Sequence, residues 1–291
     1  MAHAAAAATV AIVQSESSPA YQEFTDAVRT ELRRDAVPPD VIVLDSDQAA
    51  TRPLADVQFV IAAGIRAAQV LTARDLKQPL LLTLLPRSAY DHLVAGKHDD
   101  KRISAVFIDQ SPARYIDLLH LALPNVDRIG ILVGRDSRDT ANALAQAARE
   151  RKLKPVLETV ASDSDIFPAL QRMFADGNGV LLATPDTSVF NSQTIPNIVL
   201  STYRYHVPIV GFTQAYVKTG ALVAIYSTPS QIGLQAAEIV HGVLSGGALP
   251  GPQYPRQFDV GVNTYVARSL ELQLDNETNL HDRLEKLEHG Q

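Results

Sequence analysis

The sequence predicts an α/β fold with two doubly wound lobes, each built on a parallel sheet. Short apolar runs alternate with helical patterns along most of the chain. Most of these runs are continuous stretches of Val, Ile and Leu, which indicates strands buried on both faces of a parallel sheet. A pattern of strand, loop and helix that opens at Val10 starts afresh at Ile129, and 291 residues are more than one hydrophobic core usually organises. We therefore expect two consecutive sheets rather than one.

The expected strands are short runs rich in β-branched and aliphatic residues. In chain order they are Thr9–Gln14, Val41–Asp45, Gln58–Ala62, Pro79–Leu84, Ile103–Ile108, Arg128–Val133, Pro155–Val160, Gly179–Ala183, Pro208–Phe212, Ala221–Tyr226 and Arg256–Val260. Helical patterns are expected between them, over Ala20–Arg34, Ile65–Arg74, Pro112–Leu123, Ser137–Arg151, Ser164–Ala175 and Ser230–Leu244. In the first of these, Phe24, Val28 and Leu32 repeat at four-residue spacing, which is typical of the buried face of a helix.

The two ends of the chain differ from this pattern. Residues 1–8 are rich in alanine and are expected to be disordered, although Ala2-His3-Ala4 also resembles the cleavage end of a signal peptide. From Val266 to Gln291, leucines lie among many charges in an imperfect heptad pattern. We expect a helical tail over 266–291, either packed on a lobe or serving as an oligomerising or linking helix.

Composition and missing motifs argue against several classes of function. The net charge of −6 argues against a nucleic-acid partner, because such proteins usually carry a basic face. The chain has no cysteine, which excludes structural disulfides, thiolate zinc sites and cysteine nucleophiles. It also lacks a P-loop, a GxSxG elbow, an HExxH pair and a GxGxxG turn after the first strand. We therefore expect a protein that is not an enzyme and that uses no cofactor or metal.

The candidate site residues follow the strands, because doubly wound sheets bind ligands at the carboxyl ends of their strands. After the first five strands the candidates are Ser15, Glu16, Ser17, Gly64, Ile65, Leu84, Gln110 and Ser111. Hydroxyls and backbone N–H groups around Ser15–Ser17 can form a hydrogen-bonding cup, although Ser17 or Ser18 could equally cap the next helix. Gly64 lets a ligand approach the backbone closely.

A second group of candidates follows the later strands. They are Thr184, Asp186, Thr187, Phe212, Thr213 and Tyr226. The Asp186 carboxylate could accept a hydrogen bond from a ligand amine or hydroxyl, or it could cap a helix that begins near Ser188. Phe212 and Tyr226 are among the few aromatic residues available to line a site, since the chain has no tryptophan.

Several segments together resemble a known family. The resemblance rests on Val10–Gln14, Ala62-Ala63-Gly64, Thr184-Pro185-Asp186-Thr187, Pro208–Gly211, Val217–Leu222, Gln231–Glu238 and Val262-Asn263. Over about residues 9 to 265 the chain resembles the ABC-transporter substrate-binding proteins of the type I periplasmic-binding fold, in particular the tryptophan/tyrosine-type branch. It departs from the family pattern at Leu85–Tyr90, where an Asp-Pro pair is usual, and before Val106.

The resemblance implies a clamshell of two lobes joined by a three-strand hinge. The implied lobes are 9–109 plus 229–254 and 110–228 plus 255–265, with crossings near Ile108–Ser111, Tyr226–Pro229 and Tyr254–Gln257. It implies a non-enzymatic, exported monomer, periplasmic or anchored to the membrane, that closes on a small organic ligand and delivers it to a membrane permease. The ligand is expected to be amino-acid-like or apolar. The membrane partner is expected to be a permease or a receptor. Two alternatives stay open: a ligand-sensing domain of a signalling system, and a periplasmic carrier of an apolar lipid, which Leu80–Leu85 suggests.

Overall fold

The computed structural model describes residues 8–96, 101–135, 137–176 and 178–290, and it divides the chain into two compact units. The first unit comprises Met1–Asp109 with Ser227–Phe258, and the second comprises Gln110–Tyr226 with Asp259–Gln291. Each unit has its own sheet. The α/β class with two parallel-strand sheets, predicted from the continuous apolar runs, is confirmed.

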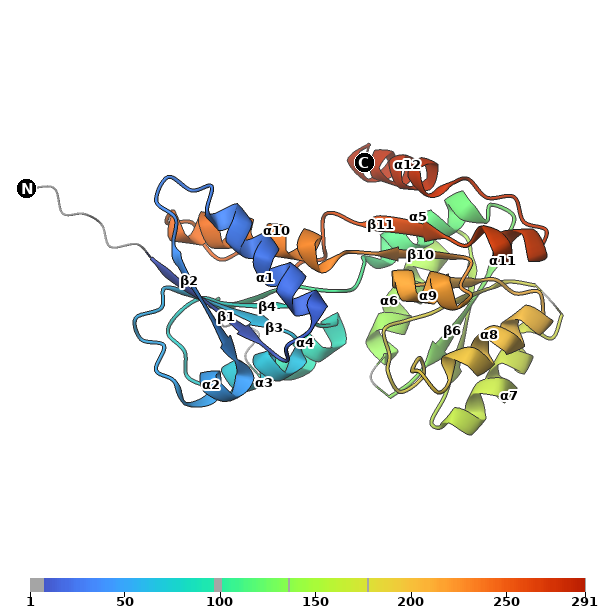
Figure 1. Cartoon of the computed structure of the whole chain (residues 1–291). Coiled ribbons are helices and arrows are strands. Elements are labelled where there is room, and N and C mark those ends of the chain that lie inside the picture. The colour runs from blue at the N-terminus through green and yellow to red at the C-terminus, as the bar shows by residue number, and fades with distance from the viewer. Residues whose placement is uncertain (1–7, 97–100, 136, 177, 291) are drawn as a thin grey trace, which may run out of the picture. The chain divides into compact units, whose positions relative to one another are not determined.

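The first unit is a five-stranded parallel sheet covered by helices on both faces (Figure 1). Its strand order is β2-β1-β3-β4-β5, formed by β1 (Thr9–Gln14), β2 (Asp40–Asp45), β3 (Phe59–Ala63), β4 (Leu80–Thr83) and β5 (Ile103–Val106). The helices are α1 (Pro19–Leu32), α2 (Ser46–Thr51), α3 (Ile65–Thr72), α4 (Arg87–Leu93) and α10 (Pro229–Leu244). Along β1, Val10 and Ile12 join the core under α1 and α10, whereas Ala11 and Val13 join the core under α2 and α3. This two-sided burial explains why the strands are continuously apolar.

The helices α1 and α10 pack closely because α10 has a glycine at their contact. Gly233 lies against α1, where an added Cβ would stand 2.7 Å from the Phe24 carbonyl oxygen and 2.9 Å from Ala27 Cβ. Backbone atoms of α1 cannot move aside as a flexible side chain could. Gly233 therefore sets the distance between two helices that are remote in the sequence.

The second unit has a six-stranded sheet with the order β11-β10-β9-β8-β6-β7. The strands are β6 (Arg128–Val133), β7 (Lys154–Thr159), β8 (Val180–Leu182), β9 (Ile209–Gly211), β10 (Val223–Tyr226) and β11 (Asp259–Val262). All pairs are parallel except β10 with β11, which is antiparallel. The helices are α5 (Pro112–Ala122), α6 (Arg138–Glu150), α7 (Asp163–Phe174), α8 (Ile195–Arg204), α9 (Gln214–Thr219), α11 (Thr264–Ser269) and α12 (Glu277–His289).

The helical tail expected over 266–291 contains α12, which packs on α5 and β11 (Figure 1). Leu280 and Leu284, one turn apart, are fully buried, while Leu287 stays 41% exposed. In the structure, α12 thus packs on its own unit, which is the first of the two alternatives for the tail. None of the described helices is long and apolar enough to cross a membrane.

All of the expected strands are present, with ends that differ by a few residues. The helices α2, α4, α8 and α9 were not predicted, and α11 overlaps the start of the helical tail expected over 266–291. The helices α2, α4 and α9 have only six or seven residues, too few for a helical period to show in the sequence. Their capping residues are the usable signal: Asp45 caps α2 and Thr213 caps α9 through side-chain oxygens.

Replacing Gly233 by alanine should destabilise the protein, because the new Cβ would overlap the α1 backbone. We expect Gly233→Ala to lower the free energy of unfolding by about 1–3 kcal/mol. The matched control is Gly242→Ala on the same helix, where an added Cβ meets nothing within 4 Å; it should raise the free energy of unfolding by about 0.5–1 kcal/mol. Urea unfolding measures both, and equal effects of the two variants would contradict the proposed close contact.

Candidate ligand-binding site

In the first unit, polar groups gather where the parallel strands β1 and β3 end. The Ser15 hydroxyl donates to the Ala63 carbonyl at 2.9 Å and accepts from the Ala67 backbone N–H at 3.0 Å. Gly64 has a φ of 90°, in the region that favours glycine. An added Cβ there would lie 2.3 Å from the Tyr21 hydroxyl oxygen and 2.5 Å from Ser15 Oγ. The structure therefore brings the candidates Ser15 and Gly64 together, with Tyr21 beside them.

Tyr21, on the first turn of α1, is a member of this group that sequence reasoning missed. Burial raises the pKa of its phenol, and a hydrogen bond with Ser15 offsets part of that rise. The hydroxyl therefore stays protonated at neutral pH and can donate or accept a hydrogen bond. The spacing between Ser15 and Tyr21 matches no known motif. The only signal in the sequence is that Tyr21 follows the turn that leads into α1.

The other candidates of the first unit lie at the same edge of the sheet but differ in exposure. Glu16, Ser17 and Ile65 are exposed. Leu84 is half-buried with a φ of 52°, a left-handed conformation that is uncommon for a residue other than glycine and that marks functional sites in many proteins. The prediction that Ser17 or Ser18 caps the next helix was right about the position, because Ser18 is the N-cap residue of α1. It was wrong about the hydrogen bond, because the Ser18 side chain makes no capping bond.

Asp109 is the last residue of the first segment of the first unit. Sequence analysis did not identify it as a candidate. It is 7% exposed, and its Oδ2 accepts the Arg87 backbone N–H, at the first residue of α4, at 2.5 Å. Burial raises the pKa of this carboxyl group to about 6, although the hydrogen bond from Arg87 acts in the opposite direction. Asp109 thus fixes the start of α4 at the cost of a buried charge.

In the second unit, two buried side chains follow β8. Thr184 is 1% exposed and Asp186 is 5% exposed. Asp186 Oδ1 accepts the Ser188 backbone N–H at 2.9 Å and the Ser188 hydroxyl at 2.6 Å. Among the described residues, neither Asp186 Oδ2 nor Thr184 Oγ1 has a hydrogen-bond partner. Asp186 caps a turn and not a helix near Ser188, since the next helix, α8, begins at Ile195.

Gly134, directly after β6, makes room for the Asp186 carboxylate. An added Cβ on Gly134 would lie 2.3 Å from both Asp186 Oδ2 and Ser188 Oγ. The Gly134 backbone N–H donates to the Ser137 hydroxyl at 3.0 Å. The unpartnered oxygen of Asp186 therefore faces a stretch of backbone without a side chain. Sequence reasoning missed Gly134 because the two residues come together only in the folded sheet.

The ends of β9 and β10 supply aromatic rings and hydroxyls. The rings of Phe212 and Tyr216 lie 4.5 Å apart between centroids. Thr213 Oγ1 accepts the Tyr216 backbone N–H at 3.3 Å and caps α9. The Tyr226 hydroxyl donates to Gln214 Oε1 at 2.6 Å. Burial raises the pKa of both tyrosines, so both phenols are neutral hydrogen-bonding groups at neutral pH.

The remaining candidates of the second unit lie in different settings. Ser111 is the N-cap of α5 and accepts the Arg114 backbone N–H at 3.2 Å. Gln110 is 3% exposed, and its Oε1 accepts from Arg114 Nη1 at 2.7 Å. Thr187 is exposed on the turn after Asp186. Gln110 is thus part of the packing at the start of α5 rather than an open polar group.

Comparison with known proteins decides what kind of molecule this is. The family described as ABC transporter substrate binding protein matches residues 50–280, more than half of the chain. The chain belongs to this family. No curated protein matches it.

Solved structures with low sequence identity share the fold of this substrate-binding protein. An ABC domain from Streptococcus pneumoniae in complex with L-Trp is 16% identical with a TM-score of 0.65, and the match covers 95% of this chain and 98% of that one. The ligand-free, open structure of CD0873, a substrate binding protein from Clostridium difficile with adhesive properties, is 16% identical with a TM-score of 0.74, over 94% and 97% of the two chains. A conserved domain protein from Vibrio cholerae is 19% identical with a TM-score of 0.63, over 94% and 98%.

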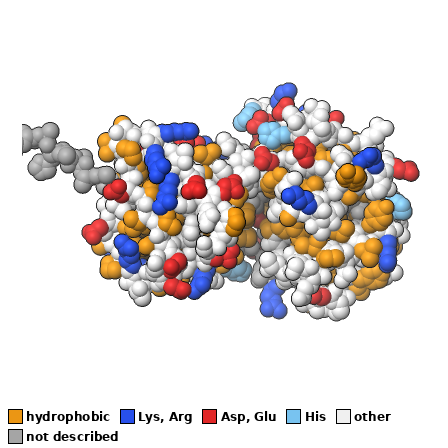
Figure 2. Space-filling model, viewed as in Figure 1, with side chains coloured by type: hydrophobic (Ala, Val, Ile, Leu, Met, Phe, Trp, Pro, Cys, Tyr) orange, Lys and Arg blue, Asp and Glu red, His pale blue; other side chains and the backbone are white. Residues whose placement is uncertain are grey.

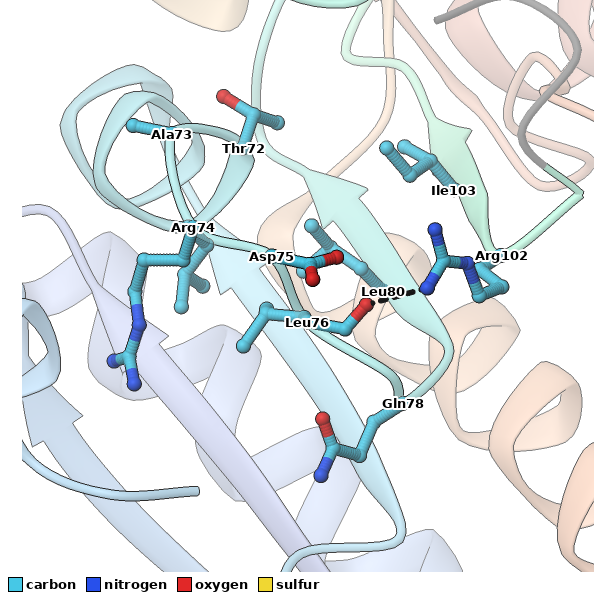
Figure 3. Close-up of a pocket in the computed structure, with 10 residues that line it drawn as sticks. Thr72, Ala73, Arg74, Asp75, Leu76, Gln78, Leu80, Arg102 and Ile103 are labelled. Atoms are coloured by element: carbon cyan, nitrogen blue, oxygen red, sulfur yellow. Dashed lines mark hydrogen bonds between the residues drawn. The ribbon is translucent and has the colours of Figure 1, made fainter. Parts of the chain in front are cut away.

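A separate cavity of about 280 Å³ lies in the first unit of this substrate-binding protein, where β4 and β5 begin (Figure 3). The Arg102 guanidinium points across it to the Leu76 carbonyl, to which it donates at 2.8 Å (Figure 3). Arg74 donates to the carbonyls of Ala49 and Arg52. Arg74 therefore fixes the end of α2, and Arg102 fixes the loop before β4. This cavity lies at the edge of the sheet opposite to the candidate residues, and doubly wound sheets do not bind ligands there.

The described residues contain no group of three or more His, Cys, Asp and Glu side chains that could hold a metal ion. On the face of each unit that Figure 2 shows, acidic and basic side chains are interspersed and no basic patch forms.

Asp109 should make the stability of the protein depend on pH. Its pKa of about 6 lies above the ordinary 3.8, so the folded state binds the proton more tightly and the free energy of unfolding falls as pH rises through this interval. In Asp109→Asn this loss is absent. The free energy of unfolding of the variant, relative to that of the wild type, should therefore rise by about 2–3 kcal/mol between about pH 4 and pH 7. Urea unfolding across this range measures the difference, with the exposed Asp56→Asn as control; a difference that does not change with pH would contradict the assignment.

Proposed function

We propose that this substrate-binding protein binds a small organic ligand that carries an amino group and delivers it to a membrane transporter. The observation that carries the proposal is Asp186 Oδ2, a carboxylate oxygen that is buried and has no hydrogen-bond partner among the described residues. A buried unsatisfied polar group costs about 1–3 kcal/mol, and more when it is charged. A ligand that donates to it removes this cost, so the site favours a cationic donor.

Thr184 supports the same ligand chemistry. Its Oγ1 is also buried without a partner among the residues that the structure describes, and it lies two residues before Asp186 in the segment that follows β8. A hydroxyl can accept from a second N–H of an ammonium group. An apolar lipid would leave both oxygens unsatisfied. The amino-acid-like alternative is therefore the better supported one, and the Phe212 and Tyr216 rings offer apolar surface for the rest of such a ligand.

We propose further that the two units are the lobes of a clamshell and that ligand binding closes it. The chain passes between the units after Asp109, Tyr226 and Phe258. Short crossings of this kind can act as hinges that absorb a change in backbone angles. A ligand favours closure only through contacts that exist in the closed state and not in the open one. We propose that groups from the first unit, Ser15 and Tyr21 among them, supply these additional contacts.

Delivery to a transporter places the protein on the outer side of a cytoplasmic membrane, with a permease as its partner. Support comes from membership of the substrate-binding family. The absence of a basic patch on the visible faces in Figure 2 agrees with a small-molecule rather than a nucleic-acid partner.

Paired ligands that differ in one amino group test the proposed role of Asp186. Isothermal titration calorimetry should detect binding of L-tryptophan or L-tyrosine and at least about tenfold weaker binding of the corresponding propionates, which lack the amino group. Asp186→Asn should reduce the affinity for the amine by at least about tenfold and leave the weak binding of the propionate unchanged.

Two further variants complete the test. Gly134→Ala should also weaken amine binding, because its Cβ would take the space in front of Asp186 Oδ2. The control is Asp176→Asn, which removes a half-exposed carboxylate of the same unit that pairs with Arg128. Equal affinity of the wild type for amine and propionate, or an unaltered affinity in Asp186→Asn, would contradict the proposal.

A further inference from the structure

One buried arginine joins two distant segments of the second unit. The Arg114 side chain, on the first turn of α5, is 8% exposed. Its Nε donates to Glu288 Oε1 at 2.5 Å and its Nη2 to Glu288 Oε2 at 2.7 Å. Its Nη1 donates to Gln110 Oε1 at 2.7 Å. A two-pronged pair of this kind fixes both the position and the rotation of the guanidinium. Glu288 of α12 is thereby linked to Gln110 through a single side chain.

Gln110 occupies a special place in the chain. It is the first residue of the second unit, directly after Asp109. Its side chain is buried, and the adjacent Ser111 caps α5. A change in the angle at which the chain enters the second unit would have to begin at or just before Gln110. Because Arg114 holds the Gln110 side chain, the chain is fixed from Gln110 onward.

The position of Glu288 is unfavourable for α12 considered alone. Glu288 lies in the last turn of the helix, where a negative charge opposes the helix dipole. The bond to Arg114 offsets this unfavourable interaction with the helix dipole. Glu288 therefore stabilises a contact between α12 and α5 rather than α12 itself. α12 is anchored in two further ways: Leu280 and Leu284 are fully buried, and Glu277 Oε1 accepts the Val262 backbone N–H at 2.9 Å.

Val262 belongs to β11, with which the chain enters the second unit for the last time. α12 is thus bonded next to two of the places at which the chain enters or leaves this unit: through Glu288 at the start of α5, and through Glu277 at β11. A helix that holds both segments restricts bending to the few residues between the units.

We propose that Glu288 is a positioning residue for ligand-driven closure: through Arg114 it holds Gln110, and so fixes the second-unit end of the first crossing. The proposal rests on the closure described under Proposed function. Loss of the Glu288 charge weakens the two bonds that fix the position and rotation of the Arg114 guanidinium, so Gln110 is held less firmly and the segment from residue 108 to 114 gains motion. The extra motion must be lost again when the ligand binds, so the affinity for the ligand falls.

Hydrogen exchange and calorimetry on the full chain test this role with Glu288→Gln, which keeps the shape of the side chain and removes its charge. The matched control is Asp117→Asn on α5, the helix that carries Arg114. Asp117 makes a similar two-pronged pair with Arg151, with side chains 15% and 22% exposed. Both variants lose one half-buried ion pair of α5, so a purely structural effect should appear in both.

In Glu288→Gln, amide exchange over residues 108–114 should rise at least about fivefold without ligand, and the affinity for an amine ligand should fall about threefold to tenfold. Asp117→Asn should change neither. Glu288→Asp should restore part of the protection, since it keeps the charge. Equal exchange in Glu288→Gln and Asp117→Asn, or increased exchange confined to residues 277–289, would overturn the positioning role.

The exchange measurement uses no ligand and decides the positioning role by itself. A wild-type protein that binds no amine would contradict the proposed function and not the link from Glu288 to Gln110. A Glu288→Gln variant with raised exchange and unchanged ligand affinity would overturn the proposed effect on closure.

Discussion

Most strands of the two sheets are buried on both faces, and this constraint limits where polar side chains can lie. Along β1, alternate residues enter two different cores, so no position within the strand can hold a polar group cheaply. Polar groups are therefore displaced to the strand ends. Because the strands are parallel, their carboxyl ends meet at one edge of each sheet. In the first unit Ser15 and Gly64 are neighbours for this reason, and in the second unit Gly134 and Asp186 are.

Within that edge, Asp186 differs from the other polar residues. Ser15, Ser111 and Thr213 have their hydrogen bonds within the protein, and they shape turns and helix starts. Asp186 has one oxygen satisfied by Ser188, and the other is buried beside Gly134 without a partner among the described residues. A buried polar atom left without a partner is expensive. In the proposed function the ligand supplies the missing hydrogen bond, which is a form of preorganisation for binding.

The sequence was sufficient to predict the sheets and most of the strands, because continuous apolar runs reflect burial on both faces directly. It was also sufficient for residues whose role is local, such as Ser111, whose capping follows from the proline after it. It was insufficient for contacts made only by folding. Gly134 against Asp186, Tyr21 against Gly64 and Glu288 against Arg114 join segments with no motif between them. The left-handed backbone of Leu84 is imposed by its surroundings, since leucine itself disfavours it.

The claim at the centre of this account is that an amine-bearing ligand closes the two units on each other. Small-angle X-ray scattering tests it most directly, on the wild-type protein with and without a saturating ligand identified by calorimetry. The account predicts that the radius of gyration falls when the ligand is bound, since closure makes the molecule more compact. A bound ligand that leaves the radius of gyration unchanged would contradict it.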